Sequence, residues 1–485
     1  MRLSVRARFR LTSSPNFILA VVCLGIFFAA IDQTVVYGAL PDMMKDISLP
    51  ITKLDEAAWI VIGYLLGYTF AMPLMGRVSD VYGHGRIYIL SLLIFMAGSM
   101  AVALGTNLQW IVGARVIQAI GGGALVPIAM AITGDIFVER RRAVALGIIG
   151  GAVEAGGALG PFYGAALAQF LGWRWIFWIN LPISLLVISI VVLFLGESPR
   201  AKGKVDYISG LFLALTLVLF SLGLSRQSTQ PYFLVYVISL SIGALLFFAL
   251  FIWRIATVSE PLFKPSMFKN VTFSAANLTN LLVGGALIIA MVNIPLMSDT
   301  IMGTSPLEGG LRLLRLTFML SLGAIAGGFL CKRFDYRLPT ILGLILSSAG
   351  FFFMSRWTIS LTDPSMTFHL AICGFGFGLV IAPLSTAVMD SVGGEERGIA
   401  SSLIVMLRMI GMIIGLSAIT SWGTGRFHLM TAGMTLNEII SAPEELVESL
   451  LALFHDFFLA AAGICLAAII PAFWLGRQRR LEMGR

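Results

Sequence analysis

Apolar residues occur along the chain in blocks of about twenty, separated by short polar joints. As α-helices, blocks of this length match the hydrocarbon core of a bilayer, so the pattern predicts an all-α polytopic membrane protein. Fourteen helices are expected, over residues 16–40, 57–76, 86–104, 109–134, 143–169, 175–195, 207–224, 232–253, 272–298, 308–331, 337–355, 366–389, 398–423 and 455–476.

The composition agrees with this interpretation. Of the 485 residues, 58% are hydrophobic and only 12% are charged, against about 25% charged in an ordinary soluble protein. The net charge of +8 requires no nucleic-acid partner, because a basic excess in a membrane protein usually marks the cytoplasmic loops.

The distribution of lysine and arginine predicts the orientation. With fourteen helices both termini lie on one side, and 23 of the 33 basic residues fall in the termini and loops of that side. Only six fall in the opposite loops. This bias predicts that both termini are cytoplasmic, as expected for a multi-pass protein of a bacterial inner membrane.

The joints divide the fourteen helices into six, two and six. Charged linkers at 197–206 and 254–270 bracket two helices, which gives a first half over 1–200, two additional helices over 201–260 and a second half over 261–485. Short basic joints follow the second helix of each half, which suggests a degenerate internal repeat. Two related six-helix halves are a transporter pattern.

Several motifs then make a family resemblance specific. The first half contains, in order, "IDQTVVYGALP" (31–41), "GRVSDVYGHGR" (76–86), "RVIQAIGGGALVP" (115–127), "GGALGPFYGA" (156–165) and "WRWIFWINLP" (173–182). With these the chain resembles the major facilitator superfamily, in particular its fourteen-helix drug:proton antiporter branch. Tyr37 stands where that branch usually has asparagine.

The second half narrows the resemblance. "GFGFGLVIAPLSTAV" (374–388) and "RMIGMIIGLSAITSWG" (408–423) look most like the triacylglyceride exporters of actinobacteria, which work with a lipoprotein partner. The resemblance implies a proton-coupled secondary transporter that exports a lipophilic substrate by alternating access, a lipid such as triacylglyceride first of all. Multidrug efflux of hydrophobic or cationic compounds is the alternative.

Two carboxylates lie well inside predicted helices, Asp32 and Glu154. Intramembrane charges are costly and usually find a partner. Glu154 lies 12 residues past Arg142, and Arg408 lies 11 residues past Arg397. At about 1.5 Å per residue the two are at nearly the same depth, in the fifth helix of each half. We predict that they pair and gate the transporter; a static ion pair that only sets helix register is the alternative.

Asp32 and Arg115 form a second predicted pair. In the family the matched residues are linked to proton coupling, and the resemblance carries that role to them. A structural pair near the outer interface is the alternative.

The joint at 76–86 matches the loop that controls conformation in this family, and the matching residues are Gly76, Asp80, Gly83 and Arg86. The segment 135–143, with Asp135 and an arginine cluster, is its predicted partner. The alternative is that those arginines serve only to set the membrane topology.

The fifth helix carries small residues at every fourth position. Gly156, Gly160 and Gly164 give one smooth face for close packing, and Pro161 removes a backbone hydrogen bond and can bend the helix. These residues predict a hinge, as opposed to small side chains that merely face lipid.

The predicted cavity is apolar, which favours lipophilic drugs or lipid tails over sugars and amino acids. The candidate polar groups within it are Gln118, Asn277, Asn280, Asn293 and Arg315. Arg315 and the neighbouring Arg312 are more simply expected to snorkel to the outer headgroups.

The segment 441–456 is predicted as an outer amphipathic extension of the last helix that guides lipid or contacts a periplasmic partner; a longer, tilted final helix is the alternative. No cofactor or metal is expected, since the cysteines and histidines are scattered. A membrane enzyme is disfavoured because no catalytic base, metal cluster or phosphate loop is present, and a channel because no polar ring recurs.

Overall fold

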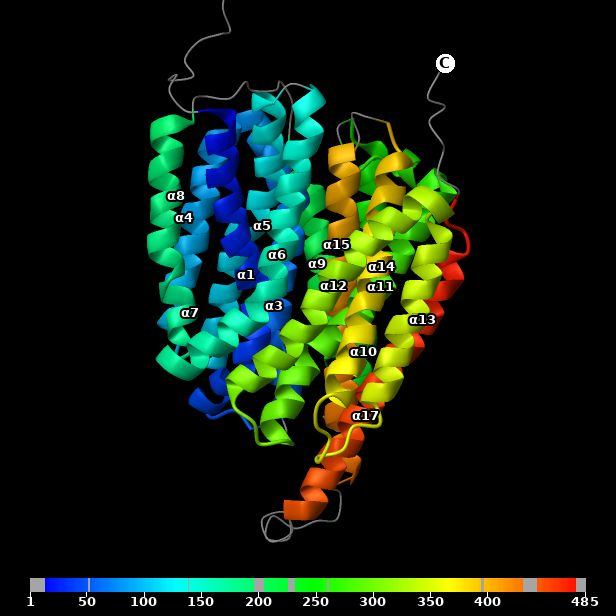
Figure 1. Cartoon of the computed structure of the whole chain (residues 1–485). Helices are drawn as coiled ribbons and strands as arrows, with labels where there is room; N and C mark the ends of the chain where they lie inside the picture. Colours follow the sequence, from blue (N-terminus) through cyan, green and yellow to red (C-terminus); the bar gives the residue numbers. More distant parts are fainter. Residues whose placement is uncertain are drawn as a thin grey trace, which may run out of the picture.

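The structure, a computed structural model, describes residues 14–50, 53–137, 139–195, 205–225, 232–259, 261–393, 397–430 and 443–476. The first and last described residues lie at the same end of a bundle of long helices (Figure 1), which we call the terminal end; the opposite end is the far end. The helices are α1 (Pro15–Asp46), α2 (Leu54–Ala57), α3 (Trp59–Tyr82), α4 (His84–Ala103), α5 (Leu108–Ile136), α6 (Glu139–Leu171), α7 (Arg174–Trp178), α8 (Asn180–Phe194), α9 (Tyr207–Leu224), α10 (Phe233–Thr257), the 3₁₀ turn η2 (Pro265–Lys269), α11 (Val271–Thr300), α12 (Pro306–Phe334), α13 (Arg337–Met354), α14 (Ser365–Asp390), α15 (Arg397–Met430) and α17 (Pro443–Ala472).

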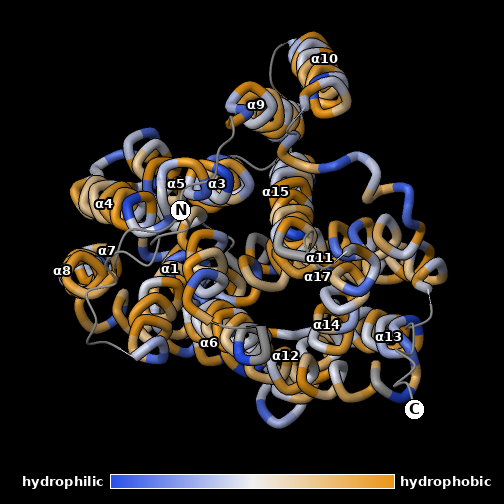
Figure 2. The backbone as a smooth tube through the Cα atoms, turned by 90° about the horizontal axis from the view of Figure 1, so that it is seen from above, coloured by the Kyte–Doolittle hydropathy of each residue, from blue (hydrophilic) through white to orange (hydrophobic). Residues whose placement is uncertain are grey.

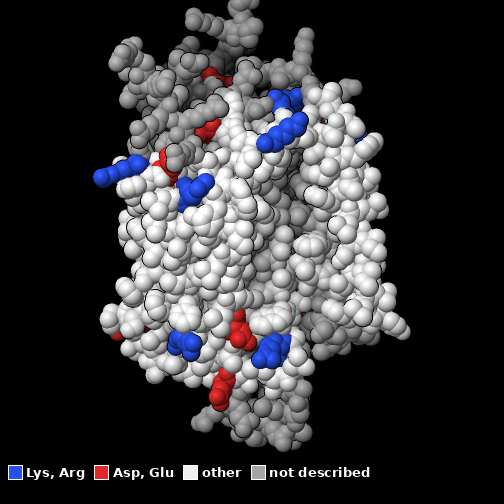
Figure 3. Space-filling view, turned by 90° about the vertical axis from the view of Figure 1, so that its right-hand side faces the viewer, with Lys and Arg blue, Asp and Glu red and all other residues white. Residues whose placement is uncertain are grey.

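Fourteen segments of the described chain are helices long and apolar enough to cross a membrane, which confirms the predicted number of spans. The outer surface agrees with this. On the face shown in Figure 3, charged side chains gather towards the two ends and leave a broad uncharged band between them. The band is the surface expected to face lipid.

The helices on either side of α9 and α10 pair in the same order. In the first set α6 packs on α1, α3 on α5, and α4 on α5; in the second α15 packs on α11, α12 on α14, and α13 on α14. Seen from above, the two sets form two groups that meet along α1, α3, α6, α11, α12 and α15 (Figure 2). Below we call them the N-half (α1–α8) and the C-half (α11–α17).

The hairpin of α9 and α10 lies at the edge of both halves (Figure 2), where α9 packs on α3 and on α15. The carboxylate of Asp206 caps α9 by accepting from the amide N–H of Ser209. Arg254, near the end of α10, donates from Nε to the same carboxylate at 3.0 Å. One acidic residue therefore joins both helices of the hairpin at the terminal end.

Several helices continue past their predicted ends, such as α1 to Asp46, α3 to Tyr82 and α15 to Met430. Two differences change the picture more. The predicted helix 175–195 is divided into α7 and α8 at Ile179, because Pro182 has no N–H to donate to the carbonyl of Trp178. The last helix begins at Pro443, twelve residues before the predicted start at 455. Its first turns project beyond the other helices at the far end (Figure 1).

The predicted extension 441–456 thus coincides with the start of α17, apart from residues 441 and 442, which lie outside the described chain. Leu450 and Phe454 are buried and, together with Phe427 of α15, line one small pocket. These turns are therefore supported by α15 rather than by α17 alone.

Candidate functional site

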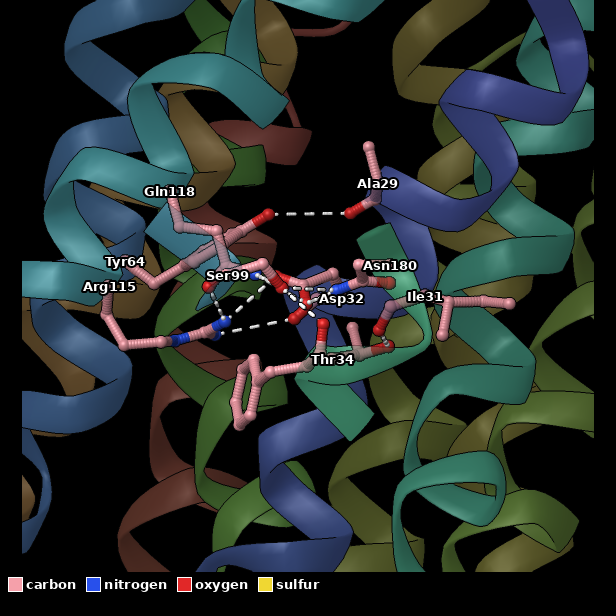
Figure 4. Close-up of polar contacts among 10 residues, drawn as sticks. Ala29, Ile31, Asp32, Thr34, Tyr64, Ser99, Arg115, Gln118 and Asn180 are labelled. Carbon is pink, nitrogen blue, oxygen red and sulfur yellow. Dashed lines mark hydrogen bonds and ion pairs between the residues drawn. The ribbon is translucent and has the colours of Figure 1, made fainter. Parts of the chain in front are cut away.

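A buried polar cluster surrounds Asp32 at the middle of α1 (Figure 4). Arg115 of α5 donates from one NH group to Asp32 Oδ2 at 2.9 Å. Asp32 Oδ1 accepts from Gln118 Nε2 at 2.9 Å and from Asn180 Nδ2 at 2.8 Å. Both amides also donate to the hydroxyl of Ser99, at 3.1 and 3.0 Å. Helices α5 and α8 therefore donate to the carboxylate that α1 carries, and α4 joins the cluster through Ser99.

Aromatic rings cover the cluster. The guanidinium carbon of Arg115 lies 3.9 Å from the centroid of the Tyr64 ring and 5.7 Å from that of Phe177. Both Asp32 and Arg115 are 1% exposed. A charged pair this deeply buried is stable only when most of its remaining hydrogen-bonding capacity is used. Gln118 and Asn180 supply two donors to Asp32, whereas Arg115 Nε has no partner among the described residues.

The sequence pairs Asp32 with Arg115 but does not predict the other members of the cluster. Gln118 is expected to face a cavity, and here it is fully buried between Asp32 and Ser99. Asn180 lies within the quoted motif 173–182, which is the one signal that could have revealed it. Ser99 lies in the part of α4 from Leu92 to Ala103, which is otherwise apolar, and belongs to none of the quoted motifs.

A second charged pair joins the two halves. Arg408 of α15 donates from NH2 to Glu154 Oε1 of α6 at 3.5 Å, as depth counting predicts. The Arg408 side chain is 11% exposed and the Glu154 side chain 49%. Gln33 of α1 reaches the neighbouring position of α15, where its amide lies 2.9 Å from the sulfur of Met409.

The helix that carries Glu154 packs tightly on α1 through its glycines. A Cβ atom added at Gly156, Gly160 or Gly164 would lie 2.5, 1.9 or 2.0 Å from the nearest atom of α1. Real Cβ atoms do not approach other atoms so closely. The predicted smooth face therefore lies against α1 and not against lipid.

Pro161 lies in the same helix and leaves the carbonyl of Gly157 without its helical donor. The hydroxyl of Thr34 on α1 donates to that carbonyl at 3.0 Å. From the C-half, the hydroxyl of Thr317 on α12 donates to the carbonyl of Ala158 at 2.8 Å. Both halves thus contact α6 in the turn that precedes Pro161.

The C-half repeats this packing where α15 meets α11. A Cβ at Gly284 would lie 2.1 Å from the carbonyl oxygen of Arg408, and one at Gly411 would lie 1.8 Å from that of Leu281. Each member of the Glu154–Arg408 pair is therefore carried by a helix fixed closely to the first helix of its own half.

Several further contacts join the halves between the level of Glu154 and the far end. Lys45 of α1 pairs with Asp299 of α11 at 2.7 Å. Gln169 of α6 accepts from the amide N–H of Leu307 on α12 at 3.0 Å. Gly310 of α12 packs on the α6 backbone around Pro161. On the terminal side of Glu154, by contrast, added Cβ atoms at Gly147, Gly150 and Gly151 of α6 would meet no atom within 4 Å.

The joint between α3 and α4 is organised around His84. Gly83, at φ +101°, ends α3, and His84 begins α4. The imidazole lies between two carboxylates, 3.2 Å from Asp80 and 2.8 Å from Asp135 of α5. The predicted contact between this joint and the segment that begins at Asp135 is thus formed through a histidine within the N-half. Gly76 lies against Pro127 of α5, and the Arg86 side chain is exposed on α4.

The asparagines of α11 are buried, at 3% exposure or less. Asn280 donates to the carbonyl of Ile404 on α15 at 2.7 Å, whereas Asn277 and Asn293 donate to carbonyls one turn back in their own helix. In this conformation only Asn280 of the three joins α11 to another helix, and a cavity-lining role for all three stays a prediction.

Arg315 lies at the far-end half of α12 and is held by the α13–α14 connection. It donates to both carboxylate oxygens of Asp363, at 2.7 and 2.9 Å, and to Thr367. The hydrogen bond from Thr367, followed by the pairing with Arg315, holds the pKa of Asp363 below its usual range. The nearby Arg312 contacts Met302 and Thr304.

Among the described residues, no group of three histidine, cysteine or acidic side chains could hold a metal ion. What the arrangement offers instead is two intramembrane carboxylates in different settings. One is sealed within the N-half, and the other is half-exposed at the contact between the halves.

Residues 22–416 match the sequence model of the Major Facilitator Superfamily. The triacylglyceride transporter of Mycolicibacterium hassiacum is 32% identical over 496 residues, covering 95% of this chain and 92% of that protein. The triacylglyceride transporter of Mycolicibacterium smegmatis is 33% identical over 502 residues (96% and 89%). That of Mycobacteroides abscessus is 35% identical over 422 residues (84% and 82%).

Among solved structures, a bacterial homologue of the human lysosomal transporter Spinster, in an inward-facing and occupied conformation, superposes with a TM-score of 0.65. It is 19% identical, covering 96% of this chain and 98% of that one. The human organic anion transporter MFSD10 gives a TM-score of 0.57 at 16% identity, over 96% and 100% of the two chains. These similarities show the fold, and the family match indicates a transporter and not an enzyme. The chain belongs to the Major Facilitator Superfamily.

Proposed function

We propose that this protein is a proton-coupled exporter that moves a lipophilic substrate, triacylglyceride first of all, by alternating access. The observation that carries the mechanism is the Glu154–Arg408 contact, a half-exposed carboxylate of one half against a buried guanidinium of the other. A pair in this position links the protonation of one residue to the contact between the halves.

The coupling follows from elementary electrostatics. While Glu154 is charged, its attraction to Arg408 favours the arrangement in which α6 and α15 are close. Protonation removes that attraction and leaves Arg408 to find another partner, so the arrangement with separated helices gains in population. Proton uptake at Glu154 would then release the contact between the halves, and proton loss would restore it.

Asp32 and Arg115 are the second proposed coupling site, with Gln118, Asn180 and Ser99 as its support. Its burial within the N-half keeps this pair apart from the contact between the halves, so a change in its protonation would not by itself release that contact. The joint around Asp80, Gly83 and His84 is proposed to stabilise one conformation and not to touch substrate.

The lipid assignment rests on two relatives that are named triacylglyceride transporters. Both align with nearly the whole length of this chain. Burial of the three α11 asparagines supports a lipid substrate, since few polar side chains remain that could recognise a polar one. Export of hydrophobic or cationic drugs is the alternative that the experiment below separates.

The proposed setting is a bacterial inner membrane with both termini in the cytoplasm, in keeping with the basic residues of the loops on the terminal side. The terminal end is then cytoplasmic and the far end periplasmic. The contacts from Lys45–Asp299 to Leu307–Gln169 would close the periplasmic side in this conformation. The first turns of α17, on that side, are the proposed contact for a periplasmic lipoprotein.

The test is transport in proteoliposomes that contain the purified chain. A fluorescent triacylglycerol and a cationic dye are compared, each with and without a pH gradient. Acceleration of the triacylglycerol by the gradient is expected, together with its loss in Glu154→Gln but not in the control Glu308→Gln. Movement of the dye alone would replace the lipid assignment by drug efflux, and movement of neither compound would refute the proposal.

A further inference from the structure

A pocket of about 750 Å³ opens at the far end of the N-half, away from both charged sites. It lies around α7, at the lower left of Figure 1, between the ends of α1 and α6 and the start of α8. A volume of this size is in the range of small-molecule sites. The lining residues are Asp46, Leu171, Gly172, Trp173, Arg174, Trp175, Trp178, Leu181 and Pro182.

The pocket carries one charge of each sign. An NH group of Arg174 donates to Asp46 at 2.8 Å, and the second NH group donates to the carbonyl of Gly105 at 3.1 Å. Their side chains are 36% and 41% exposed, so both charges can still be reached from outside. The guanidinium carbon also lies 4.4 Å from the centroid of the Trp173 ring, which fixes its position.

One donor at the pocket is buried and unused. Trp173 is 4% exposed, and its indole N–H has no hydrogen-bond partner within the described chain. An indole N–H that is removed from water usually finds a partner, since leaving it unpaired costs about 1–3 kcal/mol. Trp173 lines the pocket, so a ligand oxygen that reached past the edge of its ring would supply that partner.

The remaining lining is apolar and partly open. Trp175 is 50% exposed and Leu171 is 55% exposed. Tryptophan gathers at the level of the lipid headgroups, where its ring is in apolar surroundings and its N–H in polar ones. The pocket lies where the spans of α6 and α8 meet their connection, so it is at that level.

We propose that this pocket binds a zwitterionic phospholipid of the outer leaflet. The phosphate is held by Arg174 and by the indole N–H of Trp173, the ammonium group by Asp46, and one acyl chain lies along Trp175 and Leu181. A zwitterion satisfies both charges of the pocket at once. An anionic lipid places a like charge beside Asp46, and an uncharged glyceride leaves the ionic half of the pocket unused.

The proposal does not depend on transport and is tested by binding. The full-length purified protein is incubated with equal amounts of phosphatidylethanolamine, phosphatidylglycerol and triolein, and retained lipid is measured by native mass spectrometry. We expect at least fivefold more phosphatidylethanolamine than either competitor. Asp46→Asn and Trp173→Phe should each lower its retention at least threefold.

Two variants serve as matched controls. Trp422→Phe alters a tryptophan of α15 that is 48% exposed, and Asp363→Asn alters a far-end aspartate of the C-half. Neither should change retention. The proposal would be overturned if all three lipids were retained equally, or if the pocket variants retained as much phosphatidylethanolamine as the controls. Either result would show that the retained lipid is only the shell that surrounds the protein.

A preference for phosphatidylglycerol would overturn it too. Should Trp173→Phe fail to fold, Asp46→Asn still decides, because that side chain lies at the surface. Quenching of tryptophan fluorescence by brominated phosphatidylethanolamine in vesicles provides the second measurement; Asp46→Asn should lower it and Asp363→Asn, which removes no tryptophan, should not.

Discussion

The sharpest prediction concerns the energy that couples Glu154 to Arg408. At a separation of 3.5 Å the Coulomb attraction of two unit charges is roughly 5 kcal/mol at an effective dielectric constant of 20 and about 1 kcal/mol in bulk water. Because the Glu154 side chain is 49% exposed, the expected coupling energy lies towards the lower limit, at about 1–3 kcal/mol, a factor of roughly 5–150.

The two single substitutions should not be equivalent. Glu154→Gln leaves a guanidinium that is only 11% exposed without its partner, whereas Arg408→Gln leaves a carboxylate that water reaches. Glu154→Gln should therefore lower the apparent melting temperature more than Arg408→Gln. The charge exchange Glu154→Arg with Arg408→Glu should recover part of the loss in both stability and transport rate.

The assay is a double-mutant cycle on initial transport rates in proteoliposomes, with thermal unfolding measured in parallel. The pair Lys53–Glu56 within the N-half, with side chains 52% and 44% exposed, is the control, and its coupling should stay below about 1 kcal/mol, as is typical of exposed pairs. A coupling for Glu154–Arg408 no larger than about 0.5 kcal/mol would refute direct pairing. Full pH dependence of transport in Glu154→Gln would show that its protonation is not the switch.

Three further predictions follow from other parts of the structure. Gly160→Ala should abolish transport while the expression level is kept, because the new Cβ would lie 1.9 Å from the Thr34 hydroxyl and push α6 away from α1; rates and cysteine cross-linking measure this. Asn180→Leu should destabilise the N-half by about 1–3 kcal/mol, read as a lower melting temperature, since Asp32 loses a buried donor. Hydrogen bonds from Ser209 and Arg254 outweigh burial and hold the pKa of Asp206 below its usual range. The stabilisation that these hydrogen bonds give to the start of α9 is complete above the ordinary aspartate pKa of about 3.9. It is lost as the pH falls through the lower pKa that Asp206 has in the folded protein. Amide hydrogen exchange of α9 should therefore rise in that acidic range in wild type but not in Asp206→Ala.

The sequence predicts the spans and both charged pairs because these depend on one-dimensional quantities. The length of an apolar block sets a span, and the number of residues from a loop sets the depth of a charge. Glu154 and Arg408, 254 positions apart, are matched in this way.

The partners that complete each site depend on the rotation of a helix about its axis, which the sequence does not reveal. Ser99 and Asn180 turn towards Asp32, and Gln118 joins them and faces no cavity. Arg315 reaches a carboxylate of a connection, Asp363, that no motif marks. Depth alone does not distinguish these outcomes, since a residue at the right level can face any neighbour.

Two threonine hydroxyls, from α1 and α12, contact the α6 backbone, and they affect the energetic cost of separating the two halves. Thr34, which satisfies the carbonyl freed by Pro161, belongs to the same half as α6 and stays with it through any motion of the other half. Thr317 belongs to the opposite half, but its hydroxyl also lies 3.2 Å from the carbonyl of Leu314 in its own helix. When α12 withdraws, neither helix is left with an orphaned buried polar group. The seam between α6 and α12 can open and close repeatedly at little cost, whereas the cluster around Asp32 has no such fallback and is expected to stay intact throughout.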